Sequence, residues 1–151
     1  MLRPIAIATA VAGTLDILFA MILTIFFGRQ IGDMLRYVAS GPFPQAVEMG
    51  AGGAILGLLV HFALMAIMAA AYVWFASSNR REHLISMPLR AGVAYGIVTY
   101  IVMNLIVVPL RFGTPLPPST RSILTQLFAH ILLVGIPIAI IAARHLRSRP
   151  S

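Results

Sequence analysis

Four side chains that could do chemistry lie inside otherwise apolar segments: Asp16, His61, Asn104 and His130. Carboxyl and imidazole groups exchange protons, and histidine changes charge closest to neutral pH. A charged aspartate at the centre of a bilayer costs about 2.5–3.5 kcal/mol, so it is rarely found there without a partner. These four residues form the candidate intramembrane polar layer, and its geometry depends on the segments that carry them.

The composition predicts that those segments lie in lipid. The chain has 151 residues, of which 60% are hydrophobic and 10% are charged, and its mean hydropathy is +0.95. Soluble domains are about 45–50% apolar and about 25% charged, and a chain of this size cannot bury such an apolar excess. Cysteine is absent from the sequence, which excludes disulfides, thiolate metal sites and thiol catalysis.

Four apolar segments are each close to the ~20 residues that a helix needs to cross a bilayer. They run over residues 5–27, 52–75, 89–110 and 123–143. Backbone polar groups in lipid must be paired within their own segment, so the segments are predicted to be helices. The first is too long for the core of a cleaved signal peptide and is expected to be retained. We therefore predict an all-α, integral membrane four-helix bundle that forms a single transmembrane domain over 1–151.

The eleven basic residues are all arginines, and they lie at the ends of the apolar segments. Seven lie at the termini or in the 76–90 connection, against four in the other two connections. The positive-inside bias places both termini in the cytoplasm. Arginines spread over helix ends do not form the clustered basic face of a nucleic-acid-binding domain, so no nucleic-acid partner is expected.

The first outer connection, residues 28–51, is predicted to contain a short amphipathic helix at the membrane interface. Its apolar residues fall at i, i+3, i+4 and i+7: Ile31, Met34, Leu35 and Val38. An internal repeat is also indicated. A shift of 83 residues lays Gly13 on Gly96, and a shift of 69 lays His61 on His130. These matches suggest a tandem repeat of a two-helix hairpin.

Small residues are expected to mark the faces on which the helices pack, because they let backbones in lipid approach closely. Each segment has a stripe of small or polar residues, and the four stripes are predicted to face one another. Pro109 is expected to end the third helix, and Pro137 to kink the fourth. The glycines assigned to helix packing are Gly13, Gly53, Gly57, Gly92 and Gly96.

The depth of the polar residues suggests that they meet. At ~1.5 Å per residue, Asp16 lies about 16 Å from the inner end of its segment. His61 and His130 lie about 13 Å and about 10 Å from the outer ends of theirs, by the same rise. Three explanations remain open. Hydrogen bonds among these groups could fix the register of the helices, the groups could form a proton or solute pathway, or His61 and His130 could ligate haem b. No metal site is predicted, since zinc needs more ligands than two imidazoles and a distant carboxylate.

Several blocks of the sequence resemble a family of small four-helix bacterial inner-membrane proteins that has no established biochemical function. The blocks are residues 12–17, 52–62, 95–110 and 130–139. The resemblance implies a multi-pass protein of the bacterial cytoplasmic membrane, and it supplies no substrate. The positions that match are Asp16, His61, Asn104, Pro109, His130 and Pro137.

The motifs of soluble enzymes, such as a P-loop or a nucleophile elbow, are absent from the sequence, and a non-enzymatic role is expected. The favoured function is that of a small transport or proton-handling unit, or of an accessory subunit, with no cofactor. The alternative is a haem b-binding redox subunit. The lipid bilayer is the expected partner. Narrow polar stripes leave little room for a large solute, so a homo-oligomer or a membrane partner protein is a further alternative.

Overall fold

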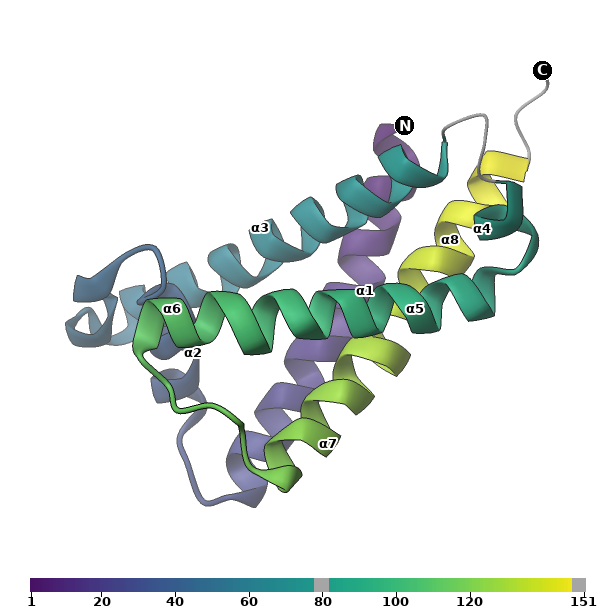
Figure 1. Ribbon diagram of the computed structural model, residues 1–151. Helices are drawn as coiled ribbons and strands as arrows, with labels where there is room; N and C mark the ends of the chain where they lie inside the picture. Colours follow the sequence, from purple (N-terminus) through teal and green to yellow (C-terminus); the bar gives the residue numbers. More distant parts are fainter. Residues whose placement is uncertain (78–81, 148–151) are drawn as a thin grey trace.

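The structure is a computed structural model that describes residues 1–77 and 82–147 (Figure 1). All regular elements in this part of the chain are helices, and four are long and apolar enough to cross a membrane. The four predicted helices are therefore confirmed, with boundaries that differ from the expected ones by four residues at most. The long helices are Leu2–Phe26, Gly50–Ala76, Pro88–Phe112 and Thr120–Arg147.

The first two long helices are regular: α1 (Leu2–Phe26) and α3 (Gly50–Ala76). The other two change from α to π geometry and back. The third consists of α5 (Pro88–Tyr100), the π-helical η2 (Ile101–Val107) and α6 (Val108–Phe112). The fourth consists of α7 (Thr120–Phe128), the π-helical η3 (Ala129–Gly135) and α8 (Ile136–Arg147). The shorter connecting helices are α2 (Ile31–Ala39), η1 (Pro44–Glu48) and α4 (Glu82–Ser86).

Each π segment ends two residues before a proline, Pro109 in one helix and Pro137 in the other. Proline has no N–H to donate, and its ring crowds the carbonyl four residues earlier. A π turn bonds i to i+5 and is wider than an α turn, which leaves more room for the ring without ending the helix. The expectation that Pro109 ends the third helix was wrong, because the helix continues to Phe112 and stops at Gly113, whose φ is +63°. Pro137, the predicted kink site, is the second residue of α8 and directly follows η3.

The start of α1, the end of α3, α4, the start of α5 and the end of α8 lie at one end of the molecule, at the upper right of Figure 1. We call this the termini end. The opposite end, the long-loop end, carries residues 27–49 and 113–119. The core between α1, α3, α5 and α8 contains many small side chains, among them Ala8, Ala12, Ala69, Ala139 and Ala142. Small side chains allow the close helix contacts that hold a bundle together in lipid.

The amphipathic segment in the first connection forms α2, as predicted, and it packs on α3. A Cβ on Gly57 would clash with the carbonyl of Leu35 in α2, and one on Gly53 would clash with the carbonyl of Ala46 in η1. The expectation that these two glycines face another long helix was therefore wrong. Packing α2 against α3 buries Leu35 and Ala39, the apolar side of the short helix.

The long-loop end of the third helix is also tied to α2. The ring of Tyr37 stacks on that of Phe112, with centroids 4.5 Å apart. Arg111 donates hydrogen bonds to the carbonyls of Gly41 (2.6 Å) and Ser40 (2.9 Å). The first connection is thus part of the folded bundle.

Candidate functional site

The first polar cluster joins α1 to α3 through Asp16 and His61. His61 is 7% exposed, and its Nε2 lies 2.9 Å from the carbonyl oxygen of Gly13. A carbonyl can only accept, so Nε2 carries the proton and donates it. This fixes the tautomer of a neutral ring and leaves a lone pair on Nδ1, which lies 4.0 Å from a carboxylate oxygen of Asp16. A small movement would allow the pair to share or exchange a proton.

The second polar cluster joins helix three to helix four around His130, which is 8% exposed. Thr99 donates its only hydroxyl proton to the carbonyl of Gly96 (3.0 Å), so its oxygen accepts from His130 Nδ1 (3.1 Å). The other ring nitrogen, Nε2, then accepts from the side-chain amide of Asn104 (3.1 Å). His130 is therefore a neutral ring with both nitrogens satisfied, a saturated cross-helix hydrogen-bond network.

The π segment explains how Thr99 and Asn104 reach the same imidazole. They are five residues apart, a spacing that places side chains on different faces of a regular α-helix. In η2 the i to i+5 bonding brings residues with this spacing close to one face. The sequence analysis missed Thr99, although its position three residues after Gly96 on the packing face was a usable signal.

The two clusters correspond to each other under the shifts that indicated a repeat. The shift of 83 that lays Gly13 on Gly96 also lays Asp16 on Thr99. In both hairpins the glycine lies at the helix contact, and the shifted side chain faces Nδ1 of the histidine. The difference is chemical, because an ionisable carboxyl in the first hairpin is replaced by a neutral hydroxyl in the second.

All four polar residues lie at a similar depth. Measured along their helices from the long-loop end, they are about 12–17 Å deep at ~1.5 Å per residue. They nevertheless form two separate groups. Within residues 1–77 and 82–147, no hydrogen bond or ion pair joins Asp16 or His61 to His130 or Asn104.

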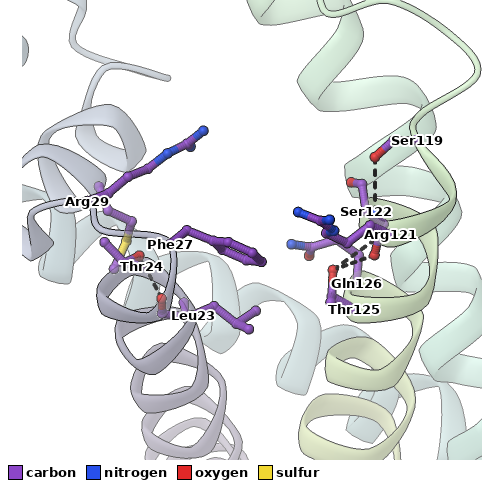
Figure 2. Close-up of a pocket in the computed structure, with 11 residues that line it drawn as sticks. Leu23, Thr24, Phe27, Arg29, Ser119, Arg121, Ser122, Thr125 and Gln126 are labelled. Atoms are coloured by element: carbon purple, nitrogen blue, oxygen red, sulfur yellow. Dashed lines mark hydrogen bonds between the residues drawn. The ribbon is translucent and has the colours of Figure 1, made fainter.

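An open pocket of about 620 Å³, which we call the vestibule, lies between α1 and α7 at the long-loop end (Figure 2). Its lining includes Ala20 and Gln126. Each lies one helical turn, four residues, from a residue of the polar layer: Ala20 from Asp16 and Gln126 from His130. Just below, the rings of Phe19 and Phe128 bridge the two helices with centroids 5.2 Å apart. Its full lining is Ala20, Leu23, Thr24, Phe27, Arg29, Met34, Ser119, Arg121, Ser122, Thr125 and Gln126.

Two of the remaining predicted packing residues, Gly92 and Gly96, lie where helices three and four are in close backbone contact. A Cβ on Gly92 would come within 2.6 Å of the backbone of Ile136, and one on Gly96 within 2.5 Å of that of Ile131. Gly135, which the sequence analysis did not single out, packs against the backbone of both of these glycines. Gly13 faces side chains of α3 instead, and a Cβ there would come within 2.7 Å of the ring of Phe62.

The geometry does not fit haem held between His61 and His130. An axial ligand must direct a free ring nitrogen at the iron. In His130 both nitrogens are bonded to protein groups, and in His61 one is bonded to Gly13 while the other faces Asp16. The two rings also belong to separate clusters. In the part of the chain that the structure describes, no group of three His, Cys, Asp or Glu side chains could hold a metal ion.

No protein-family model, curated protein or solved structure matches the chain.

Proposed function

We propose that this protein is a small proton-handling transport unit of the bacterial cytoplasmic membrane, with both termini in the cytoplasm. Asp16 and His61 are its proton-binding pair, and the vestibule is their access from the long-loop side. The observation that carries the proposal is the Nδ1 of His61, which forms no hydrogen bond with any described residue. It lies 4.0 Å from a carboxyl group inside a bundle of apolar helices.

The contrast between the two clusters separates this role from a purely structural one. Side chains that only fix the helix register should be saturated with hydrogen bonds, as His130 is. The carboxyl group of Asp16 has no hydrogen-bond partner among the described residues, and its one ion-pair partner is His61. An intramembrane carboxyl group with spare bonding capacity is suited to taking up and releasing a proton.

We infer that the molecule is a duplicated two-helix hairpin whose copies have diverged in role. The second copy keeps Thr99 and His130 as a neutral network that locks helices three and four together. The first copy keeps an ionisable pair at the corresponding positions. On this interpretation only the first hairpin handles protons. Substitutions of its ionisable pair should therefore lower proton flux, whereas substitutions in the neutral network of the second hairpin should lower stability.

The test is proton flux into proteoliposomes that contain a pH-sensitive dye and are driven by a potassium diffusion potential. We expect Asp16→Asn and His61→Gln to lower the flux at least about tenfold, because proton transfer by a positioned side chain contributes roughly 10²–10⁴-fold. Asp33→Asn and His83→Gln are matched controls, since both residues are exposed and lie on short connecting helices. Gel filtration and circular dichroism would establish that each variant is folded.

Two results would overturn the proposal. Wild-type vesicles with no more flux than empty ones would favour the accessory-subunit role. Flux that is equal in the wild type and in folded Asp16→Asn and His61→Gln proteins would remove the pair from the pathway. Infrared difference spectra offer an independent check, because the band of a protonated carboxylic acid should disappear in Asp16→Asn and persist in Asp33→Asn.

A further inference from the structure

The vestibule has a charge pattern that proton handling does not require. Arg29, just after α1, and Arg121, in the first turn of α7, are part of its lining, and no acidic side chain is. Neither arginine forms an ion pair with any residue that the structure describes. Figure 2 shows both side chains on the two sides of the opening, with Phe27 between them. Two unpaired guanidinium groups at one pocket favour an anion.

The neighbouring polar groups leave donors free for such an anion. The hydroxyls of Thr24 and Thr125 bond to carbonyls of their own helices. The side chains of Ser122 and Gln126 form no hydrogen bond among the described residues, so both can donate into the vestibule. The guanidinium carbon of Arg121 lies 5.4 Å from the ring centroid of Phe27, a cation–π contact that holds the group over the pocket.

The end of α1 offers little competition for these donors. The carbonyls of Leu23 and Thr24 already accept hydrogen bonds from the backbone N–H groups of Phe27 (3.0 Å) and Arg29 (2.9 Å). The wall of the pocket also has an apolar side, formed by Leu23, Phe27 and Met34. A volume of about 620 Å³ lies within the range of small-molecule sites, roughly 300–1,000 Å³.

We propose that the vestibule binds an organic anion, a phosphate monoester, phosphodiester or carboxylate group that carries a hydrocarbon chain. The anionic group lies between Arg29 and Arg121, where Ser122 and Gln126 donate to it, and the hydrocarbon part packs on Leu23 and its apolar neighbours. The anion has two sources, an anionic lipid of the surrounding leaflet or a water-soluble compound. This inference rests on the proposed function in one respect, the naming of what enters the vestibule. Binding of the anion does not depend on it, because binding can be measured without proton flux.

The experiment uses two probes on the full-length protein in neutral detergent. Native mass spectrometry measures retention of phosphatidylglycerol against phosphatidylcholine, and calorimetry measures binding of hexyl phosphate against inorganic phosphate. A hydrogen bond to a charged group is worth enough for roughly tenfold in affinity. We therefore expect the double variant Arg29→Gln/Arg121→Gln to weaken binding of the preferred probe by more than about tenfold. Arg90→Gln, at the termini end, should bind as the wild type does.

Each outcome has a definite meaning. Retention of phosphatidylglycerol without binding of hexyl phosphate supports the lipid source, and the reverse supports a soluble anion. If the double variant fails to fold, the milder Arg121→Lys variant takes its place. Lysine keeps the charge but loses the planar fork of arginine, so this variant should bind the probe with intermediate affinity. Binding of neither probe, or an equal loss in Arg90→Gln, would overturn the inference. Binding without proton flux would instead overturn the proposed function and leave the anion site in place.

Discussion

The close approach of helices three and four gives a quantitative test at Gly96. An alanine there would place its Cβ 2.5 Å from the carbonyl oxygen of His130 and 2.5 Å from the Cα of Ile131, about 0.9 Å short of the 3.4 Å at which ordinary contact begins. Both obstacles are backbone atoms, so no side chain can rotate away. The two helices must separate, and overpacking of this kind costs about 1–3 kcal/mol.

The separation also stretches the bond from His130 to Thr99, which is 3.1 Å long. Cross-helix hydrogen bonds in membrane proteins are worth ~0.6 kcal/mol on average. The higher helix propensity of alanine offsets up to ~1 kcal/mol of this loss of stability. We expect Gly96→Ala to lower the free energy of unfolding by about 1.5 kcal/mol, roughly tenfold in the unfolding equilibrium constant.

The assay is reversible unfolding in mixed micelles, followed by circular dichroism as the fraction of sodium dodecyl sulfate rises. The matched control is Gly52→Ala on α3, because a Cβ at that position meets nothing within 4 Å. This control should be at least as stable as the wild type. A Gly96→Ala protein that unfolds at the same detergent fraction as Gly52→Ala would show that the helices do not pack at the distance described.

Three further predictions concern other parts of the structure. Gly57→Ala should loosen α2 from α3 without unfolding the long helices, and limited proteolysis of the first connection should detect the release. The chain has no native cysteine, so Ala20→Cys in the vestibule should react with a membrane-impermeant maleimide added from the long-loop side, whereas buried Ala69→Cys should not. Asn104→Leu removes one partner of His130 and should destabilise the fold by about 0.6 kcal/mol in the unfolding assay, while proton flux remains.

The sequence alone determined the four long helices, α2 and the depth of the polar side chains along their helices. An apolar run of about 20 residues in lipid has no alternative to a helix, because its backbone groups must bond to one another. The rise along such a helix then places Asp16, His61, Asn104 and His130 at comparable depths without any knowledge of the neighbouring helices. The amphipathic spacing of its apolar residues also predicted α2, because this spacing is a local pattern that does not depend on the neighbouring helices.

The tertiary structure alone decided which groups meet. Which side chains pair across helices depends on the rotation and crossing angle of those helices. Apolar faces of similar composition do not distinguish one arrangement from another, and only close contacts such as that of Gly96 with η3 select it. The π segments were not predicted either, and one of them, η2, directly precedes Pro109 and brings Asn104 to His130. The layer expected as one group is therefore divided, with one histidine saturated by neutral partners and the other left beside a carboxyl group.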